Sequence, residues 1–243
     1  MNLARSIWIG FDPREADAFA VCRDALRNHL TQKVPISGIV LDDLRTRGLY
    51  TRPTESRKGF DRPVLWDVIS DAPMSTEFAV SRFLIGHLAK TGYAAFMDCD
   101  VLPRANIARL FEICERDPSK AVWCVKHQHV PPAGLKMDGA PQVQYSRKNW
   151  SSVMVWRVEH PKNRALTLEM INALPGRDLH RFCWLDDDDI GELDLEWNWL
   201  VGYSPPVPAP KLVHFTSGGP WLSGFEHVAF ADEWRAARNR WAA

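Results

Sequence analysis

The chain has 243 residues, of which 46% are hydrophobic and 25% charged, as is typical of a globular protein with a sizeable core. Thirty basic and thirty acidic side chains cancel, so no excess of positive charge favours nucleic acid as the main partner. No apolar run is long enough to span a membrane, no secretory signal is visible, and the five cysteines lie far apart. These features predict a reducing, cytoplasmic location.

Predicted strands and helices alternate along the N-terminal half of the chain. In chain order we expect strands over residues 6–11, 34–41, 93–97, 121–126, 152–156 and 211–215, helices over 15–30, 75–90, 105–115, 160–173 and 225–241, and long loops over 45–63 and 127–149. Asp12 and Pro13 are typical of the start of the first helix. The alternation predicts an α/β fold with a mostly parallel central sheet and helices on both faces.

Two carboxylates one residue apart, Asp98 and Asp100, directly follow the apolar strand predicted over residues 93–97. Open α/β sheets bind ligands beyond the carboxyl ends of their strands, and residues i and i+2 of an extended chain point the same way. Two carboxylates facing one spot repel each other unless a cation lies between them, and hard divalent cations often bridge to phosphates. The pattern predicts a metal–diphosphate site; the alternative is a polar strand end with a helix cap.

His214 is the best candidate for a third metal ligand. It ends a short apolar strand and precedes the flexible turn Thr-Ser-Gly-Gly-Pro. An imidazole with two carboxylates suits Mn²⁺ better than Mg²⁺. The alternative for His214 alone is a hydrogen-bonded histidine near the core.

The order of several motifs resembles retaining glycosyltransferases of the family 8 type, such as glycogenin and lipopolysaccharide galactosyltransferases. The motifs are Asp98-Cys-Asp100, His214-Phe-Thr-Ser-Gly-Gly-Pro-Trp221, the helix with Ala79–Ile85, the segment Asn149–Trp156, the acidic run Asp186–Asp189 and the pair Trp197-Asn198. The resemblance implies a GT-A fold and metal-dependent transfer of a hexose from a nucleotide-diphosphate sugar, usually UDP-linked, with retention of configuration. The implied cofactor is Mn²⁺ or Mg²⁺.

The resemblance also implies roles for the predicted metal ligands and for one arginine. Asp98, Asp100 and His214 would hold the ion, and Asp98 would also face the nucleotide ribose. Arg82 would reach the donor sugar or the diphosphate, whose oxygens suit a bidentate guanidinium. The alternative for Arg82 is an ion pair on its helix.

Three further aspartates would lie near the donor by the same resemblance. Asp12 would lie near the nucleotide, although a helix cap explains it equally well. Asp187 and Asp188 would face the donor sugar and the reaction centre, with Asp188 the nearest candidate for a nucleophile or sugar-positioning group. The alternative for this acidic run is a solvated loop.

The chain departs from the family at the glycine-rich turn. Gly219 stands where the family has a lysine that touches the diphosphate, and the motif is one residue shorter. The backbone amides of Ser217, Gly218 and Gly219 are candidates to cradle a phosphate instead. Arg57 or Lys58, from the predicted 45–63 loop, is a candidate replacement for the missing charge.

The resemblance predicts a single domain over residues 1–243. Residues 1–126 would form a nucleotide-binding half, 127–224 an acceptor half that completes the metal site, and 225–243 a C-terminal helix. The acceptor stays open among glycans, lipids, proteins and small molecules. The basic tail helix either packs on its own domain or lies on an anionic membrane.

Two other functions remain open at this point. A nucleotide-sugar-binding protein without transferase activity would account for the missing diphosphate lysine. A metal-dependent nucleotidyltransferase would share an α/β sheet, but that class more often has a Gly- and Lys-rich loop after its first strand, which Gly10-Phe-Asp-Pro-Arg14 is not.

Overall fold

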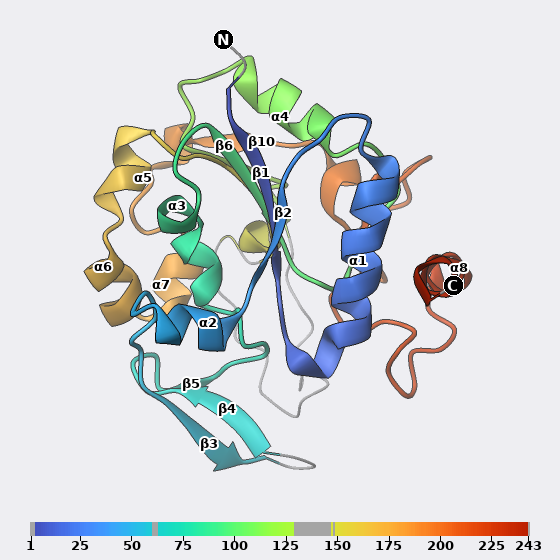
Figure 1. Cartoon of the computed structure of the whole chain (residues 1–243), viewed down its shortest axis with the longest axis horizontal. Coiled ribbons are helices and arrows are strands. Elements are labelled where there is room, and N and C mark those ends of the chain that lie inside the picture. Colours follow the sequence, from blue (N-terminus) through green and yellow to red (C-terminus); the bar gives the residue numbers. More distant parts are fainter. Residues whose placement is uncertain (1–2, 60–62, 129–146, 148, 243) are drawn as a thin grey trace.

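The centre of the protein is a six-stranded sheet with the strand order β10-β8-β9-β6-β1-β2 (Figure 1). The computed structural model describes residues 3–59, 63–128, 147 and 149–242. The β1–β2, β1–β6 and β8–β10 pairings are parallel, whereas β9 runs antiparallel to β6 and β8. Helix α1 lies on one side of the sheet, and α3, α5 and α6 lie on the other (Figure 1). The predicted fold class, α/β with a mostly parallel central sheet, is confirmed.

Two smaller sheets accompany the central one, in the orders β11-β12-β7 and β3-β4-β5. The strands are β1 Arg5–Gly10, β2 Ile36–Ile39, β3 Thr54–Lys58, β4 Pro63–Asp67, β5 Ala72–Pro73, β6 Tyr93–Met97, β7 Val101–Pro103, β8 Val122–Cys124, β9 Val153–Arg157, β10 Ile190–Glu192, β11 Trp199–Leu200 and β12 Leu212–His214. The α-helices are α1 Ala16–His29, α2 Leu41–Thr46, α3 Ile85–Leu88, α4 Ala108–Glu115, α5 Pro161–Ala165, α6 Leu168–Ala173, α7 Gly176–His180 and α8 Ala231–Ala242.

Strand β6 is the middle of the core. All five of its residues are buried, as expected for a strand whose two faces are both covered. At the carboxyl end of neighbouring β1, a Cβ on Gly10 would lie 2.4 Å from the ring of Phe78, so only glycine allows this approach. The close packing fixes the strand ends beyond which the predicted site lies.

Several predicted elements differ from the structure. Within the predicted 45–63 loop, β3 pairs with β4 in an antiparallel hairpin, which the exposed, charged residues of β3 do not indicate. The predicted helix over 75–90 is instead a series of turns, a short 3₁₀ helix over Ser81–Leu84 and the single turn α3. Residues 80–85 are all buried, so this segment has no polar face of the kind a surface helix presents.

The helix predicted over 160–173 is divided into α5 and α6, because Thr167 caps a new helix with its side-chain oxygen. The C-terminal helix begins at Ala231, not near Phe225, after a residue with a left-handed backbone, Phe230 (φ 64°). Most of the loop predicted over 127–149 lies outside the described residues.

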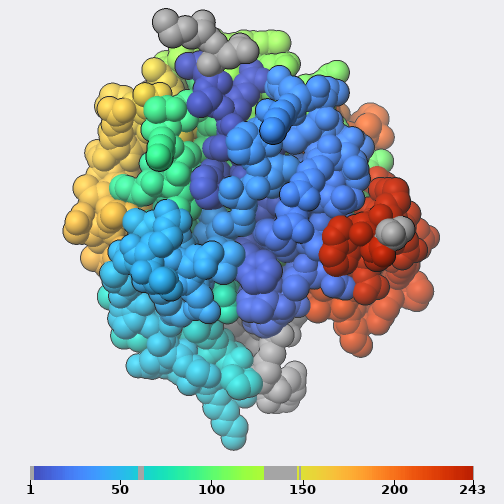
Figure 2. All heavy atoms as spheres, in the orientation of Figure 1, coloured from blue at the N-terminus to red at the C-terminus, as the bar shows by residue number. Residues whose placement is uncertain are grey.

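Helix α8 packs on α1, as the red and blue surfaces of Figure 2 show. Its buried residues Trp234 and Ala237 join Val21 and Ala25 of α1 in one apolar cluster. Arg238 also forms an ion pair of 2.9 Å with Asp17. Packing of the helix on its own domain is therefore observed for Trp234 and Ala237, whereas Trp241 is 41% exposed. Within the described part of the chain, a bilayer-crossing helix of sufficient length and hydrophobicity is not found.

Candidate metal and donor site

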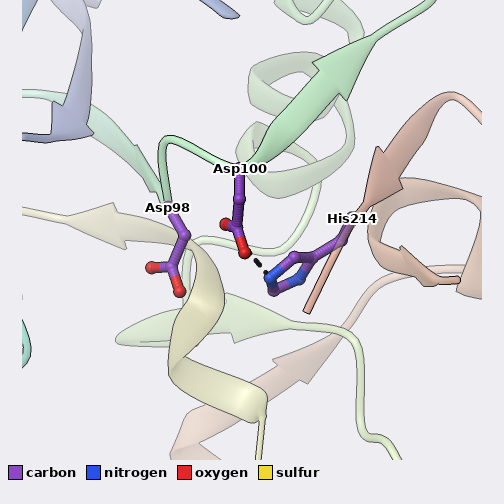
Figure 3. Close-up of side chains that lie close together, drawn as sticks. All are labelled: Asp98, Asp100 and His214. Atoms are coloured by element: carbon purple, nitrogen blue, oxygen red, sulfur yellow. Dashed lines mark ion pairs between the residues drawn. The ribbon is translucent and has the colours of Figure 1, made fainter. Parts of the chain in front are cut away.

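Asp98, Asp100 and His214 lie together at the carboxyl end of β6 (Figure 3). The two aspartates lie between β6 and β7, and His214 ends β12, which pairs with β7 so that His214 is opposite Val101. A ligand atom from each of the three side chains lies within 4.8 Å of the other two. The sheet pairing thus brings an imidazole from far down the chain to the two carboxylates, and we call this group the metal-ligand cluster.

Each carboxylate of the metal-ligand cluster lies beside a basic side chain. Asp98 Oδ1 lies 2.8 Å from Arg82 Nη1, and Asp100 Oδ1 lies 3.3 Å from His214 Nε2. The Asp98 and Asp100 side chains are only 15% and 16% exposed. Within the described residues, Oδ1 of each aspartate is buried and accepts no well-aligned hydrogen bond. A metal ion bound here would share or displace the contacts that these oxygens make with Arg82 and His214.

Burial and charge shift the three titrations in different directions. Burial raises the pKa of Asp98 to about 6, although the Arg82 charge opposes the rise. Burial also acts to raise the pKa of Asp100, but the charge and hydrogen bond of His214, together with a backbone hydrogen bond and the charge of Arg82, outweigh it and lower that pKa below its ordinary value. Burial acts to lower the pKa of His214, but the Asp100 carboxylate outweighs it and raises that pKa. A divalent ion would compete with protons here near neutral pH.

Arg82 is held rigidly beside Asp98. Its guanidinium carbon lies 5.2 Å and 5.1 Å from the ring centroids of Phe78 and Phe96, and Nη1 donates to the carbonyl of Ser151 at 3.0 Å. The residue is 5% exposed. The predicted Arg82 therefore lies at the cluster, with an aspartate ligand as its ion-pair partner.

Asn198 and Ser152 support His214, although the sequence predicted no role for either residue. Nδ1 of His214 lies 2.9 Å from Oδ1 of Asn198, and Nδ2 of Asn198 donates to Oγ of Ser152 at 2.9 Å. Asn198 belongs to the Trp-Asn pair of the resemblance, but only the burial of its side chain (0% exposed) shows that its amide faces inward.

Glu15 is the third residue near the cluster that the sequence did not identify. It accepts a hydrogen bond from Cys99 Sγ at 3.4 Å. Burial and the negative charge of Asp100 raise its pKa to about 7. From the sequence it reads only as an acidic residue in the first turn of a helix.

Asp12 is a helix cap in the structure. Its side chain is fully buried and accepts hydrogen bonds from the backbone N and the guanidinium of Arg14 and from the backbone N of Glu77. Both carboxylate oxygens are used in these contacts. The helix-cap interpretation is confirmed, and the nucleotide contact stays a prediction.

The structure does not bring Asp187 and Asp188 to the metal-ligand cluster. The carbonyl of Asp189 accepts from the backbone N of Ala121, just before β8, and the strand register continues through β8 and β9 to Ala94. Ala94 precedes Asp98 by about 13 Å of extended strand.

The acidic run therefore lies at the amino end of β8, whereas the cluster lies at the carboxyl end of β6. Asp187 and Asp188 are exposed, and Asp187 pairs with Arg147. Lys162 bonds Asp186 and Asp189. This arrangement matches the solvated-loop alternative.

The glycine-rich turn after His214 packs an aromatic ring. A Cβ on Gly219 would lie 1.9 Å from the ring of Trp221, so a lysine does not fit there without rearrangement. The backbone N of Gly218 donates to the carbonyl of Phe215 at 2.7 Å, and Ser217 Oγ lies 2.9 Å from the hydroxyl of Tyr203. The amide of Gly218 is thus already engaged within the turn, and the phosphate cradle of Ser217, Gly218 and Gly219 stays a prediction.

The predicted substitutes for the missing lysine lie on the β3–β4 hairpin, which projects from the domain (Figure 1). Arg57 stacks on Trp66 at 4.2 Å and forms ion pairs with Glu55 and Asp71. Lys58 is exposed. Neither is a described neighbour of the metal-ligand cluster.

Two carboxylates and an imidazole are a suitable donor set for a divalent first-row metal, and their spacing fits one ion. No model of a known protein family matches the chain. Among curated proteins, the chain is 40% identical over 234 residues to Protein CDI of Arabidopsis thaliana, in an alignment that covers 94% of this chain and 83% of that protein.

Several solved glycosyltransferase structures share the fold. The bifunctional glycosyltransferase WbbM superposes with a TM-score of 0.61 at 17% identity, over 98% of this chain and 50% of WbbM. The galactosyltransferase LgtC, in complex with donor and acceptor sugar analogs, superposes with a TM-score of 0.58 at 10% identity, over 97% of this chain and 95% of LgtC. GlyE of Streptococcus pneumoniae gives 0.55 at 12% identity, with 99% of this chain and 64% of GlyE covered. The chain thus spans about half of WbbM and under two thirds of GlyE.

Proposed function

The chain belongs to the family of Protein CDI of Arabidopsis thaliana, and from its glycosyltransferase fold and its metal-ligand cluster we propose that it is a metal-dependent glycosyltransferase. The observation that carries the proposal is the convergence of Asp98, Asp100 and His214 within 4.8 Å at the carboxyl end of the central sheet. This is the edge at which open α/β sheets bind nucleotides.

The proposed donor is a nucleotide-diphosphate hexose, in the first instance a UDP-sugar, and the proposed cofactor is Mn²⁺ or Mg²⁺. LgtC, whose fold this chain shares, binds donor and acceptor sugar analogs. We carry over the nucleotide-diphosphate hexose and the retention of configuration from the motif resemblance. Both remain proposals for this chain.

The proposed chemistry follows from where charge develops. Cleavage of the anomeric C–O bond leaves positive charge on the sugar and negative charge on the departing diphosphate. A divalent ion held by Asp98, Asp100 and His214 would act as a Lewis acid toward the diphosphate oxygens. Arg82 holds Asp98 in place through their 2.8 Å ion pair and adds positive charge at the same spot.

The acceptor side has a candidate cavity of about 430 Å³ beyond the ends of β8 and β10, with lining residues that include Lys126, Glu192, Asp194 and Tyr203. Leu200, another lining residue, pairs with His214 between β11 and β12. The cavity thus lies next to the strand that carries the imidazole. Carboxylates and a tyrosine suit sugar hydroxyls, so we propose a hydroxyl-rich acceptor.

A second candidate function is nucleotide-sugar binding without transfer. Gly219 favours it, because the turn has no room for the diphosphate lysine of similar enzymes. A panel of nucleotide sugars with Mn²⁺ separates the two functions by release of the free nucleotide diphosphate. Asp100→Asn is expected to abolish release, and Glu112→Gln, an exposed charge on α4, serves as the control.

If the protein binds a nucleotide sugar but never releases the diphosphate under any acceptor, the binding function is correct and the transferase proposal fails. For an active donor, the anomeric configuration of the product, measured by NMR, tests retention. Turnover that survives Asp100→Asn would remove Asp100 from the reaction.

A further inference from the structure

A chain of buried hydrogen bonds runs from the backbone to His214. Ser152 Oγ donates to the carbonyl of Asn149 at 2.8 Å, Asn198 Nδ2 donates to Ser152 Oγ at 2.9 Å, and Asn198 Oδ1 lies 2.9 Å from His214 Nδ1. Asn198, Ser152 and His214 are 0%, 4% and 2% exposed. Water therefore has little access to replace any member of the chain.

The direction of every hydrogen bond in this series follows from the acceptor at its start, the carbonyl of Asn149. A backbone carbonyl only accepts, so the Ser152 hydroxyl uses its single proton on Asn149 and can offer only lone pairs to Asn198. The amide of Asn198 must then turn its NH₂ group toward Ser152. That orientation leaves its oxygen, which only accepts, facing the ring of His214.

The ring of His214 consequently carries a proton on Nδ1. The other ring nitrogen, Nε2, lies 3.3 Å from Asp100 Oδ1 and belongs to the metal-ligand cluster. A neutral imidazole with its proton on Nδ1 presents the lone pair of Nε2 to that group, and this lone pair is what a metal ion requires. The opposite tautomer would present an N–H and exclude the ion.

We propose that Asn198 is a positioning residue that selects the metal-binding tautomer of His214, with Ser152 setting the orientation of its amide. The inference rests on the proposed metal site, since it assigns a supporting residue to one of its ligands. The segment that contains Ser152 also contacts Arg82 and Asp98, on the other side of the metal-ligand cluster. The carbonyl of Ser151 accepts from Arg82, and the carbonyl of Ser152 accepts from the backbone N of Asp98.

The test is Mn²⁺ affinity, followed by the electron paramagnetic resonance signal of free Mn²⁺, with and without UDP. Asn198→Leu removes the acceptor at nearly constant volume and is expected to weaken Mn²⁺ binding by about 10- to 100-fold. Asn198→Asp keeps an oxygen acceptor for Nδ1–H and is expected to restore affinity to within a few-fold of the wild type.

Asn163→Leu is the matched control. Asn163 is also buried, and its amide donates to the carbonyls of Ala121 and Arg157, at the opposite end of the sheet from the cluster. Its loss is expected to lower stability but to leave Mn²⁺ affinity unchanged. Thermal unfolding of each metal-free variant separates stability from metal binding.

Equal Mn²⁺ affinity in folded Asn198→Leu and in the wild type overturns the inference, as does an equal loss in Asn163→Leu. If Asn198→Leu does not fold, Ser152→Ala decides, because a free amide orientation is expected to weaken Mn²⁺ binding and unchanged affinity overturns the role. If the wild type binds no Mn²⁺, either with or without UDP, the metal site of the proposed function is refuted, and this inference with it.

Discussion

Glu15→Gln is expected to stabilise the metal-free protein at neutral and alkaline pH. Burial and the nearby Asp100 raise the pKa of Glu15 from its ordinary value of 4.5 to about 7. Because the folded-state pKa lies above the unfolded one, the native state binds the extra proton between these values. The wild-type free energy of unfolding therefore falls as the pH rises through this interval.

The size of the effect follows from the shift. At about 1.4 kcal/mol for each pKa unit, the change from 4.5 to about 7 corresponds to about 3 kcal/mol, which partial solvent access reduces toward about 2 kcal/mol. Glutamine resembles the protonated acid and carries no such penalty. The stability difference between Glu15→Gln and the wild type should be small near pH 5 and grow by this amount up to pH 8.

Urea unfolding in EDTA across this pH range measures the difference directly. Glu112→Gln, at an exposed position of α4, provides a control that should track the wild type at every pH. If the Glu15→Gln and wild-type curves stay parallel from pH 5 to pH 8, Glu15 is not a buried acid with a raised pKa. The placement of this carboxyl beside Cys99 and Asp100 would then be wrong.

Three further changes test packing contacts of the fold. Gly219→Ala puts a Cβ 1.9 Å from the Trp221 ring and is expected to cost about 1–3 kcal/mol in urea unfolding; no loss would show that the ring does not cover the turn. Arg52→Met breaks an ion pair with Asp67 in which the side chains are 0% and 2% exposed, at a cost of about 3–5 kcal/mol. Adding Asp67→Leu should recover part of that loss, because the carbonyls of Ile171 and Leu174 still lack their donor, and a double variant as unstable as Arg52→Met would contradict the buried-pair explanation. Trp234→Ala, at a 3% exposed position of α8, should cost about 3–5 kcal/mol, whereas unchanged stability would mean that α8 does not pack on α1.

The central strands were predictable because each is a short run of apolar residues that ends at a polar residue. Asp98 and Asp100 follow such a run, and the sheet rule for carboxyl ends was enough to predict where they lie. His214 could be proposed as their partner only because it ends a short apolar strand and because the motif order resembles a known family. The β7–β12 pairing that brings it there is a contact between distant segments, which residue patterns do not encode.

The acidic run shows the opposite case. Four adjacent aspartates look like a site, but Lys162 and Arg147 pair with three of them at the protein surface. Charge patterns alone do not reveal which partner a carboxylate finds. Glu15 and Asn198 were missed for the reverse reason, since an ordinary helix residue and a lone asparagine acquire their roles only through burial.

The site draws its side chains from Arg82, Asp98, Asp100, Asn198 and His214, so more than half of the chain separates its first contributor from its last. No short fragment can assemble it, and such distant pairings are expected to form slowly during folding. Any ligand that binds there would favour the fully folded state over every partly open one. Amide hydrogen exchange should therefore slow down in all the central strands at once when a ligand occupies the site. Such a joint change would show that occupancy suppresses global rather than local opening.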